Sequence, residues 1–176
     1  MVNSGTRRQP RSWRLLALLL SVLWLPVLSV AGDLGTPTGE VLLSVEGKVD
    51  VRNSNSGARL DYALLAEIGF VTRTITTDWT ESAEYEGVSG RELVEFLGIS
   101  GAYLQGIAHD DYEVLIPLSD LVQYDTLFAV AKDGERLSMK NKGPIWLLYA
   151  NDNRPDISPE VLNSRMIWQL HTLVSQ

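Results

Sequence analysis

The sequence contains no cysteine among its 176 residues. This absence excludes a thiol nucleophile, a disulfide, a zinc or iron–sulfur site held by thiolates, and a lipid anchor attached through cysteine. A domain of this composition needs no oxidative folding, so its stability must come from packing.

Several other chemical signatures are absent. Histidine occurs only at His109 and His171, and there is no Gly-x-Ser-x-Gly elbow, which argues against a Ser-His-Asp hydrolase. The sequence also lacks a glycine-rich phosphate loop, a His-Glu-x-x-His pair and a calcium-loop spacing. No catalytic residue is therefore predicted, and a hydrolase that uses His109 with a carboxylate is kept only as an alternative.

The N-terminal segment has the features of a secretory signal. Four arginines between Arg7 and Arg14 precede the apolar run Leu15–Val30, and Ser29-Val30-Ala31 is a small-x-small cleavage pattern. The run is short for a spanning helix of ~20 residues. We expect residues 1–31 to be a signal peptide for general secretion, and the protein to be periplasmic or secreted with no membrane span after cleavage. An uncleaved anchor and twin-arginine export, suggested by Arg7-Arg8, stay open.

The remaining chain is strongly acidic. The signal segment holds four of the 15 basic residues and none of the 22 acidic ones, which leaves 11 basic against 22 acidic residues and a net charge of −11. Such a surface repels nucleic acid and anionic membranes, so neither is expected as a partner. A basic protein partner fits better.

Hydrophobic patterning predicts a single domain over 41–176, after a flexible lead-in at 32–40 that is rich in glycine and proline. A capping box, Ser89 with Glu92, begins a helix that Gly98 ends. We expect two further short helices, at 59–67 and 117–122, a hairpin turn at Asp133-Gly134, and a polar loop at 152–159. Strands are expected at 41–51, 70–79, 102–108, 112–116, 127–131, 136–139, 145–149 and 166–174, and the wholly apolar strand at 145–149 is expected to be buried. The pattern predicts an α+β class: a mixed β-sheet sandwich with short helices.

Candidate binding residues lie near the ends of these elements. Trp79 follows a Thr-rich strand and Tyr112 follows Asp110 and Asp111, so either aromatic ring could line a pocket for a planar ligand. His109 beside two aspartates could bind a metal, but neighbouring strand residues point to opposite faces, so a polar turn is expected and no metal. Arg165 could bind an anionic group or pair with one of the many carboxylates. Trp146 and Trp168 are expected in the core.

Four segments, taken in order, resemble the oxidoreductase molybdopterin-binding domain, the sulfite-oxidase-type fold. They are the helix entry Glu86–Leu93, the stretch Ala108–Tyr112 with Ile116–Asp120, the pair Asp133-Gly134 with Gly143–Tyr149, and the closing segment Arg165–Leu170. The resemblance covers roughly residues 41–173. It implies a compact α+β fold that cradles a molybdopterin cofactor.

The same resemblance implies that the usual chemistry is missing. Active members have a cysteine about four residues before a tryptophan, and this thiolate ligates the metal. Here Ile75 or Thr76 falls at that position before Trp79, and neither supplies a thiolate. Counterparts of the residues that hold the pterin phosphate are not evident, and a net charge of −11 disfavours a polyanionic cofactor.

The sequence therefore favours a small exported member of this fold without the metal ligand. It would be a non-catalytic binding or interaction module in the periplasm, serving a membrane signalling protein or a redox enzyme. Its candidate surface is the cofactor mouth: Trp79, Asp110, Asp111, Tyr112 and Arg165. The alternative is an oxidoreductase, or an accessory subunit of one, that binds a molybdopterin-type cofactor without a protein thiolate.

Overall fold

Two β-sheets and short helices make up the part of the chain that the computed structural model describes, which is Met1, residues 34–150 and residues 157–176. The predicted signal peptide and most of the expected polar loop lie outside these residues. The first sheet has the order β2-β1-β10-β5-β6, and the second has the order β3-β4-β7-β8 with β9 also paired to β7. The strands β1 and β10 pair in parallel, and the other strand pairs within the described residues are antiparallel.

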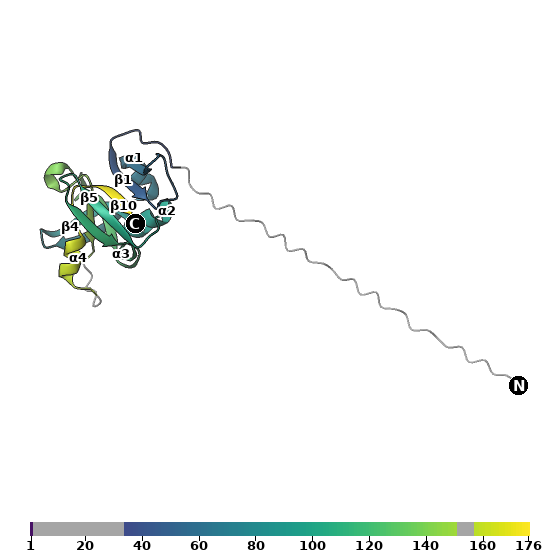
Figure 1. The fold of residues 1–176 in the computed structure, drawn as a ribbon. Coiled ribbons are helices and arrows are strands. Elements are labelled where there is room, and N and C mark those ends of the chain that lie inside the picture. The colour runs from purple at the N-terminus through teal and green to yellow at the C-terminus, as the bar shows by residue number, and fades with distance from the viewer. Residues whose placement is uncertain (2–33, 151–156) are drawn as a thin grey trace. The chain divides into compact units, whose positions relative to one another are not determined.

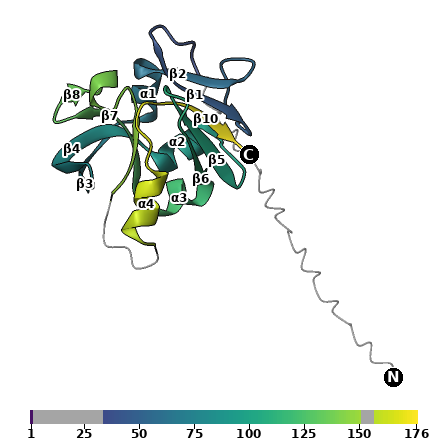
Figure 2. The ribbon, with the colours of Figure 1, turned by 60° about the vertical axis from the view of Figure 1, so that its left-hand side comes forward.

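The strands and helices have the following bounds. The first sheet contains β1 Val41–Gly47, β2 Gly57–Asp61, β5 Tyr103–Ala108, β6 Glu113–Pro117 and β10 Leu170–Ser175; the second contains β3 Val71–Thr77, β4 Thr80–Ser89, β7 Thr126–Lys132, β8 Glu135–Arg136 and β9 Trp146–Tyr149. The helices are α1 Tyr62–Ile68, α2 Gly90–Leu97, α3 Leu118–Gln123 and α4 Pro159–Arg165, with a 3-10 turn at Met139–Asn141. Figure 1 shows β1, β10 and β5 side by side, and Figure 2 shows α4 next to α3 and β6. The predicted α+β class is confirmed.

The core lies around β7 and β9, which are buried on both faces. Every residue of β9 is buried, and so are residues 126–131 of β7. A strand buried on both sides needs a continuous apolar run instead of an alternating one, because both of its faces contact other side chains. The prediction of a buried strand at 145–149 is confirmed for this reason.

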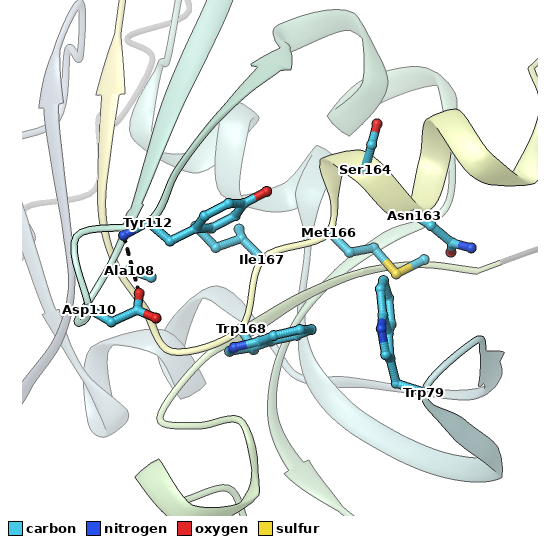
Figure 3. Close-up of a pocket in the computed structure, with 9 residues that line it drawn as sticks. All are labelled: Trp79, Ala108, Asp110, Tyr112, Asn163, Ser164, Met166, Ile167 and Trp168. Atoms are coloured by element: carbon cyan, nitrogen blue, oxygen red, sulfur yellow. Dashed lines mark hydrogen bonds between the residues drawn. The ribbon is translucent and has the colours of Figure 1, made fainter.

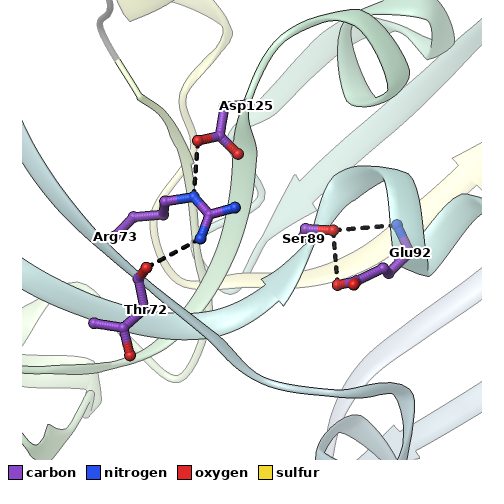
Figure 4. Close-up of polar contacts among 5 residues, drawn as sticks. All are labelled: Thr72, Arg73, Ser89, Glu92 and Asp125. Atoms are coloured by element: carbon purple, nitrogen blue, oxygen red, sulfur yellow. Dashed lines mark hydrogen bonds and ion pairs between the residues drawn. The ribbon is translucent and has the colours of Figure 1, made fainter.

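The helix α2 begins and ends where its sequence signals place it. The Ser89 hydroxyl accepts a hydrogen bond from the Glu92 backbone N–H at 3.2 Å and donates one to the Glu92 carboxylate at 2.8 Å (Figure 4). Gly98 ends the helix in the left-handed conformation, with φ of 62°. Leu93 and Leu97 are buried beneath the helix. Local hydrogen bonding therefore sets both ends of this helix before tertiary contacts are considered.

The predicted hairpin turn at Asp133-Gly134 is also confirmed. Both residues have positive φ, 50° and 81°, as the turns that join two antiparallel strands require. The second strand of this hairpin is shorter than expected, because β8 ends at Arg136 and a 3-10 turn follows at Met139–Asn141.

Two predicted elements are wrong in type or position, and one helix was not predicted. The expected helix at 59–67 is β2 followed by α1, since the helical spacing of Leu60 and Leu64 spans the junction of a strand and a helix. The expected loop ends in helix α4, which Ser158 caps and Pro159 opens. The closing strand begins only at Leu170, and a register irregularity after this residue breaks the alternation that the sequence suggested.

The segment that was expected to be a flexible lead-in is fixed against the domain from Leu34 onward. Leu34 is buried, and the backbone N–H groups of Thr38 and Gly39 donate to the Asp61 carboxylate at 2.7 and 2.8 Å. The other oxygen of Asp61 accepts from the Leu64 N–H at 2.9 Å and so caps α1. One buried carboxylate thus joins the lead-in, β2 and α1.

This carboxylate should make stability pH-dependent. The N–H groups of Leu64 and Gly39 hold the pKa of Asp61 below its usual 3.8, against the opposing effect of burial. Because the folded pKa lies below the unfolded one, the contribution is complete above the unfolded pKa and is lost as pH falls through the folded value. We expect Asp61→Ala to cost about 2–3 kcal/mol at pH 7 in urea unfolding, and the difference from wild type to shrink below pH ~4. Glu95→Ala, which removes an exposed carboxylate from α2, should show no such trend. A difference for Asp61→Ala that is independent of pH would contradict this account.

Candidate functional site

An aromatic pocket of about 410 Å³ lies between the β3–β4 turn, the β5–β6 turn and the segment that leads from α4 into β10. Figure 3 shows Tyr112 and Trp168 on opposite sides of the pocket, with Trp79 at one end and Asp110 at the other. Its lining residues are Trp79, Ala108, Asp110, Tyr112, Asn163, Ser164, Met166, Ile167 and Trp168. A small pocket with aromatic walls and few polar groups is the usual form of a site for a small organic ligand.

Trp79 is held by the tight turn between β3 and β4. The Thr77 hydroxyl accepts hydrogen bonds from the backbone N–H groups of Trp79 and Thr80, at 3.1 and 3.0 Å. This side-chain bonding to the backbone is the reason that Thr favours such turns. The indole of Trp79 meets that of Trp168 edge to face, with 5.5 Å between ring centres. Trp79 is nevertheless 42 % exposed, so part of its indole ring is accessible to a ligand.

The β5–β6 turn supplies Asp110 and Tyr112. The N–H of Asp111 donates to the Ala108 carbonyl at 3.1 Å, and the N–H of Tyr112 donates to the Asp110 carboxylate at 3.2 Å. Asp111 adopts φ of 63°, a left-handed conformation that aspartate tolerates better than most residues. The turn places Asp110 and Tyr112 on the pocket, whereas Asp111 is not a lining residue.

Arg165 does not reach the pocket. Its guanidinium donates to the buried Asp120 carboxylate at 2.7 Å, and the Tyr149 hydroxyl donates to the same oxygen at 2.9 Å. Of the two roles considered for Arg165, binding an anionic group or pairing with a carboxylate, the structure shows the second. Burial and the adjacent Asp120 carboxylate raise the pKa of Tyr149. The residues before and after Arg165 line the pocket, so this buried cluster fixes the end of α4 against α3 and β9.

The sequence analysis did not predict the side of the pocket that α4 forms. Asn163, Ser164 and Met166 come from the end of α4, and Trp168 was expected in the core. The signal for the helix was present, because Ser158-Pro159-Glu160 has the cap, the first-position proline and the early acidic residue of a helix start. The position of Trp168 had no such local signal, since it depends on the bridge between Ile167 and Leu147.

Lys142 lies against three tryptophans at the base of this site. Its ammonium nitrogen is 4.0 Å from the ring centre of Trp168, 4.8 Å from that of Trp146 and 5.6 Å from that of Trp79. Partial burial lowers the pKa of Lys142. Indole faces attract cations, so the contact stabilises the arrangement of the two rings that line the pocket.

The pocket has an anionic character. Asp110 is the one charged side chain among the described residues that line it. The ion pairs found among the described residues are Arg73–Asp125 and Arg165–Asp120, so Asp110 forms no ion pair within the described chain; the Lys142 ammonium lies at the base of the site, beside Trp168.

His109 lies outside this pocket and next to the other histidine. The ring centres of His109 and His171 are 4.7 Å apart, and His109 lines a separate cavity with Arg136 and Glu40. Among the described residues, no group of three or more histidines and carboxylates is arranged to hold a metal ion.

The residues present do not fit a molybdopterin cofactor. Ile75, at the position implied for the metal-ligating cysteine, is 1 % exposed in the core, and Thr76 points to solvent. Neither is a lining residue of the pocket, and no lysine or arginine in the described part of the chain lines it to neutralise a phosphate. A soft metal centre needs a thiolate from the protein, and an anionic cofactor needs positive charge.

Comparison with known proteins supports the fold. No protein-family model matches the chain, and no curated protein matches it. Among solved structures, the crystal structure of the sulfane dehydrogenase SoxCD from Paracoccus pantotrophus is similar, with a TM-score of 0.57 and 16 % sequence identity over 81 % of this chain. The match spans 40 % of the SoxCD chain. At this identity the likeness shows the fold alone, and it confirms the predicted α+β, sulfite-oxidase-type architecture.

Within the described residues, no helix has the length and apolar character needed to cross a membrane.

Proposed function

We propose that this protein is an exported, non-catalytic binding module of the sulfite-oxidase-type fold, which acts in the periplasm. The observation that carries the proposal is the aromatic pocket formed by Trp79, Tyr112 and Trp168. The pocket offers apolar surface and one carboxylate, which suits reversible binding of a small ligand with an apolar body. The basic n-region and apolar run of residues 1–31 support export.

The absence of the usual chemistry supports the non-catalytic part of the proposal. The sequence has no cysteine, and Ile75 and Thr76 occupy the position where the resemblance implies a thiolate. A module that binds a ligand without transforming it would serve a partner, and the acidic surface favours a partner with a basic face. A membrane signalling protein or a redox enzyme of the periplasm is the class of partner we propose.

Binding at the pocket can be tested with Trp79→Ala. We expect a neutral planar probe, 1-naphthol, to quench the tryptophan fluorescence of the purified protein, and Trp79→Ala to weaken binding at least tenfold. Because Trp79 is 42 % exposed, the free energy of unfolding should change by no more than about 1 kcal/mol. Met139→Ala, which removes another exposed apolar side chain outside the pocket, should leave binding unchanged. Equal binding by wild type and Trp79→Ala would contradict the proposed site.

A second function is favoured by the likeness to the sulfane dehydrogenase. The chain would then be an oxidoreductase, or an accessory subunit of one, that binds a molybdopterin-type cofactor without a protein thiolate. Protein purified from the periplasm of its own host distinguishes the two. The proposed binding module should contain neither molybdenum by mass spectrometry nor pterin by fluorescence after oxidation. One molybdenum or one pterin per chain would establish the second function in place of the first.

A further inference from the structure

We infer that the aromatic pocket selects an organic cation, such as an alkylated ammonium group. The inference rests on the proposed function and names the class of ligand that its pocket takes. Three features carry it: the aromatic walls, the carboxylate of Asp110 without a neutralising partner, and the absence of lysine and arginine among the described lining residues.

The walls of the pocket suit a cation with apolar substituents. Tyr112 and Trp168 face each other across the pocket, and Trp79 and Met166 close the end opposite Asp110 (Figure 3). A cation over the face of an indole or phenol ring gains about 0.5–1 kcal/mol where it is exposed and about 2 kcal/mol where it is desolvated. Methyl groups on the nitrogen lower the cost of removing the cation from water and pack against the rings.

The Asp110 carboxylate determines the sign of the charge that a ligand must carry. Asp110 Oδ1 accepts one hydrogen bond, from the Tyr112 N–H at 3.2 Å, and no described lysine or arginine pairs with it. The neighbouring Asp111 is exposed and Glu113 follows, so the local field at this end of the pocket is negative. An anionic ligand would be repelled here, whereas a cation would find its counter-ion beside the Tyr112 ring.

Lys142 shows that the tryptophan cluster accepts a cation, and it also limits where a second one can bind. Its ammonium lies 4.0 Å from the centre of Trp168, and it is not a lining residue of the pocket. Two positive charges near one ring repel each other, so the ligand cation belongs at the Asp110 and Tyr112 end. Removing the charge of Lys142 should therefore strengthen the binding of a cation.

The test compares choline with its neutral carbon isostere, 3,3-dimethyl-1-butanol, by isothermal titration of the purified protein. We expect choline to bind at least tenfold more tightly than the isostere. Asp110→Asn and Tyr112→Leu should each weaken choline binding about tenfold, and Lys142→Met should strengthen it severalfold. Glu95→Gln removes an exposed carboxylate on α2, away from the pocket, and should leave the affinity unchanged.

Two sources could supply this chemistry, a free alkylated ammonium compound or the basic side chain of a partner. Choline binding tighter than that of Nα-acetyl-lysine amide and Nα-acetyl-arginine amide assigns the pocket to the free compound, and the reverse order assigns it to a protein partner. The inference is overturned if the isostere binds as tightly as choline, if Asp110→Asn keeps full affinity, or if none of the cations binds. Where 1-naphthol still binds in a Trp79-dependent manner, the proposed function survives that failure.

Discussion

Replacing Asp120 with alanine should lower the free energy of unfolding by about 3–5 kcal/mol, the usual cost of breaking a buried ion pair by removing one partner. One oxygen of Asp120 accepts from the Arg165 guanidinium at 2.7 Å and from the Tyr149 hydroxyl at 2.9 Å. The Asp120 side chain is 4 % exposed and that of Arg165 is 25 % exposed. The variant leaves a half-buried guanidinium without its counter-ion and a buried hydroxyl without its acceptor.

The matched control is the other ion pair of the described chain, Arg73–Asp125. Its two side chains are 37 % and 32 % exposed, and the contact of 2.8 Å is therefore screened by water (Figure 4). We expect Asp125→Ala to cost about 0–1 kcal/mol in the same urea titration. Similar costs for the two substitutions would show that burial does not decide the strength of these pairs.

A double variant distinguishes the lost attraction between Asp120 and Arg165 from the cost of leaving one of their charges buried and unpaired. In Asp120→Ala combined with Arg165→Met, neither charge of this pair remains, so the loss should be smaller than the sum of the two single losses by about 0.5–3 kcal/mol. Additive losses would mean that the two side chains contribute independently. Because Arg165 ends α4, Asp120→Ala should also loosen Asn163 and Ser164 and weaken the binding of ligands to the pocket.

Local signals predicted those elements whose ends are fixed by their own residues. The helix α2 follows from Ser89, Glu92 and Gly98, which bond within one turn of the helix ends. The hairpin follows from Asp133-Gly134, because both residues tolerate positive φ. Both elements also contact distant parts of the chain, since α2 buries Leu93 and Leu97 and the Asp133 carboxylate accepts from the Glu84 N–H, but their ends are fixed by local residues, so the sequence alone was sufficient to place them.

Prediction failed where one pattern crosses two elements. Leu60 and Leu64 have helical spacing, yet Leu60 belongs to β2 because it pairs with Leu43 of β1. Asp61 then caps α1 and makes the break between strand and helix. A partner strand that lies earlier in the sequence decided the structure of residues 57–61, and periodicity contains no information about such a partner.

The pocket shows the same division between local and distant effects. The sequence identified Trp79 from its place after a strand and Tyr112 from its place after paired aspartates, and the structure brings both together with Asp110 at the pocket. It placed Arg165 with them, but a buried carboxylate 45 residues earlier holds that side chain elsewhere. Trp168 was assigned to the core, yet it forms one wall of the pocket on one side and contacts Trp146 on the other.

Trp146→Ala should cost about 3–5 kcal/mol of unfolding free energy, as is usual for a large aromatic side chain removed from a core. Trp146 is 1 % exposed, and it packs edge to face against Tyr85 with 5.7 Å between ring centres. It also contacts Trp168 and the ammonium of Lys142. Its loss therefore removes support from beneath the wall of the pocket, so ligand affinity should fall together with stability.

Trp146→Phe distinguishes packing from hydrogen bonding. The indole N–H of Trp146 is buried with no acceptor among the described residues, and an unpaired buried donor carries a desolvation cost. Phenylalanine removes this donor and keeps most of the ring volume, so its cost should be only about 1–2 kcal/mol in urea unfolding. Trp79→Ala is the comparison at an exposed tryptophan, and it should weaken ligand binding while leaving the free energy of unfolding nearly unchanged. An equal loss of unfolding free energy in Trp146→Phe and Trp146→Ala would contradict this account. It would mean that the indole N–H has an acceptor in solution and that ring packing alone does not explain the tryptophan at this position.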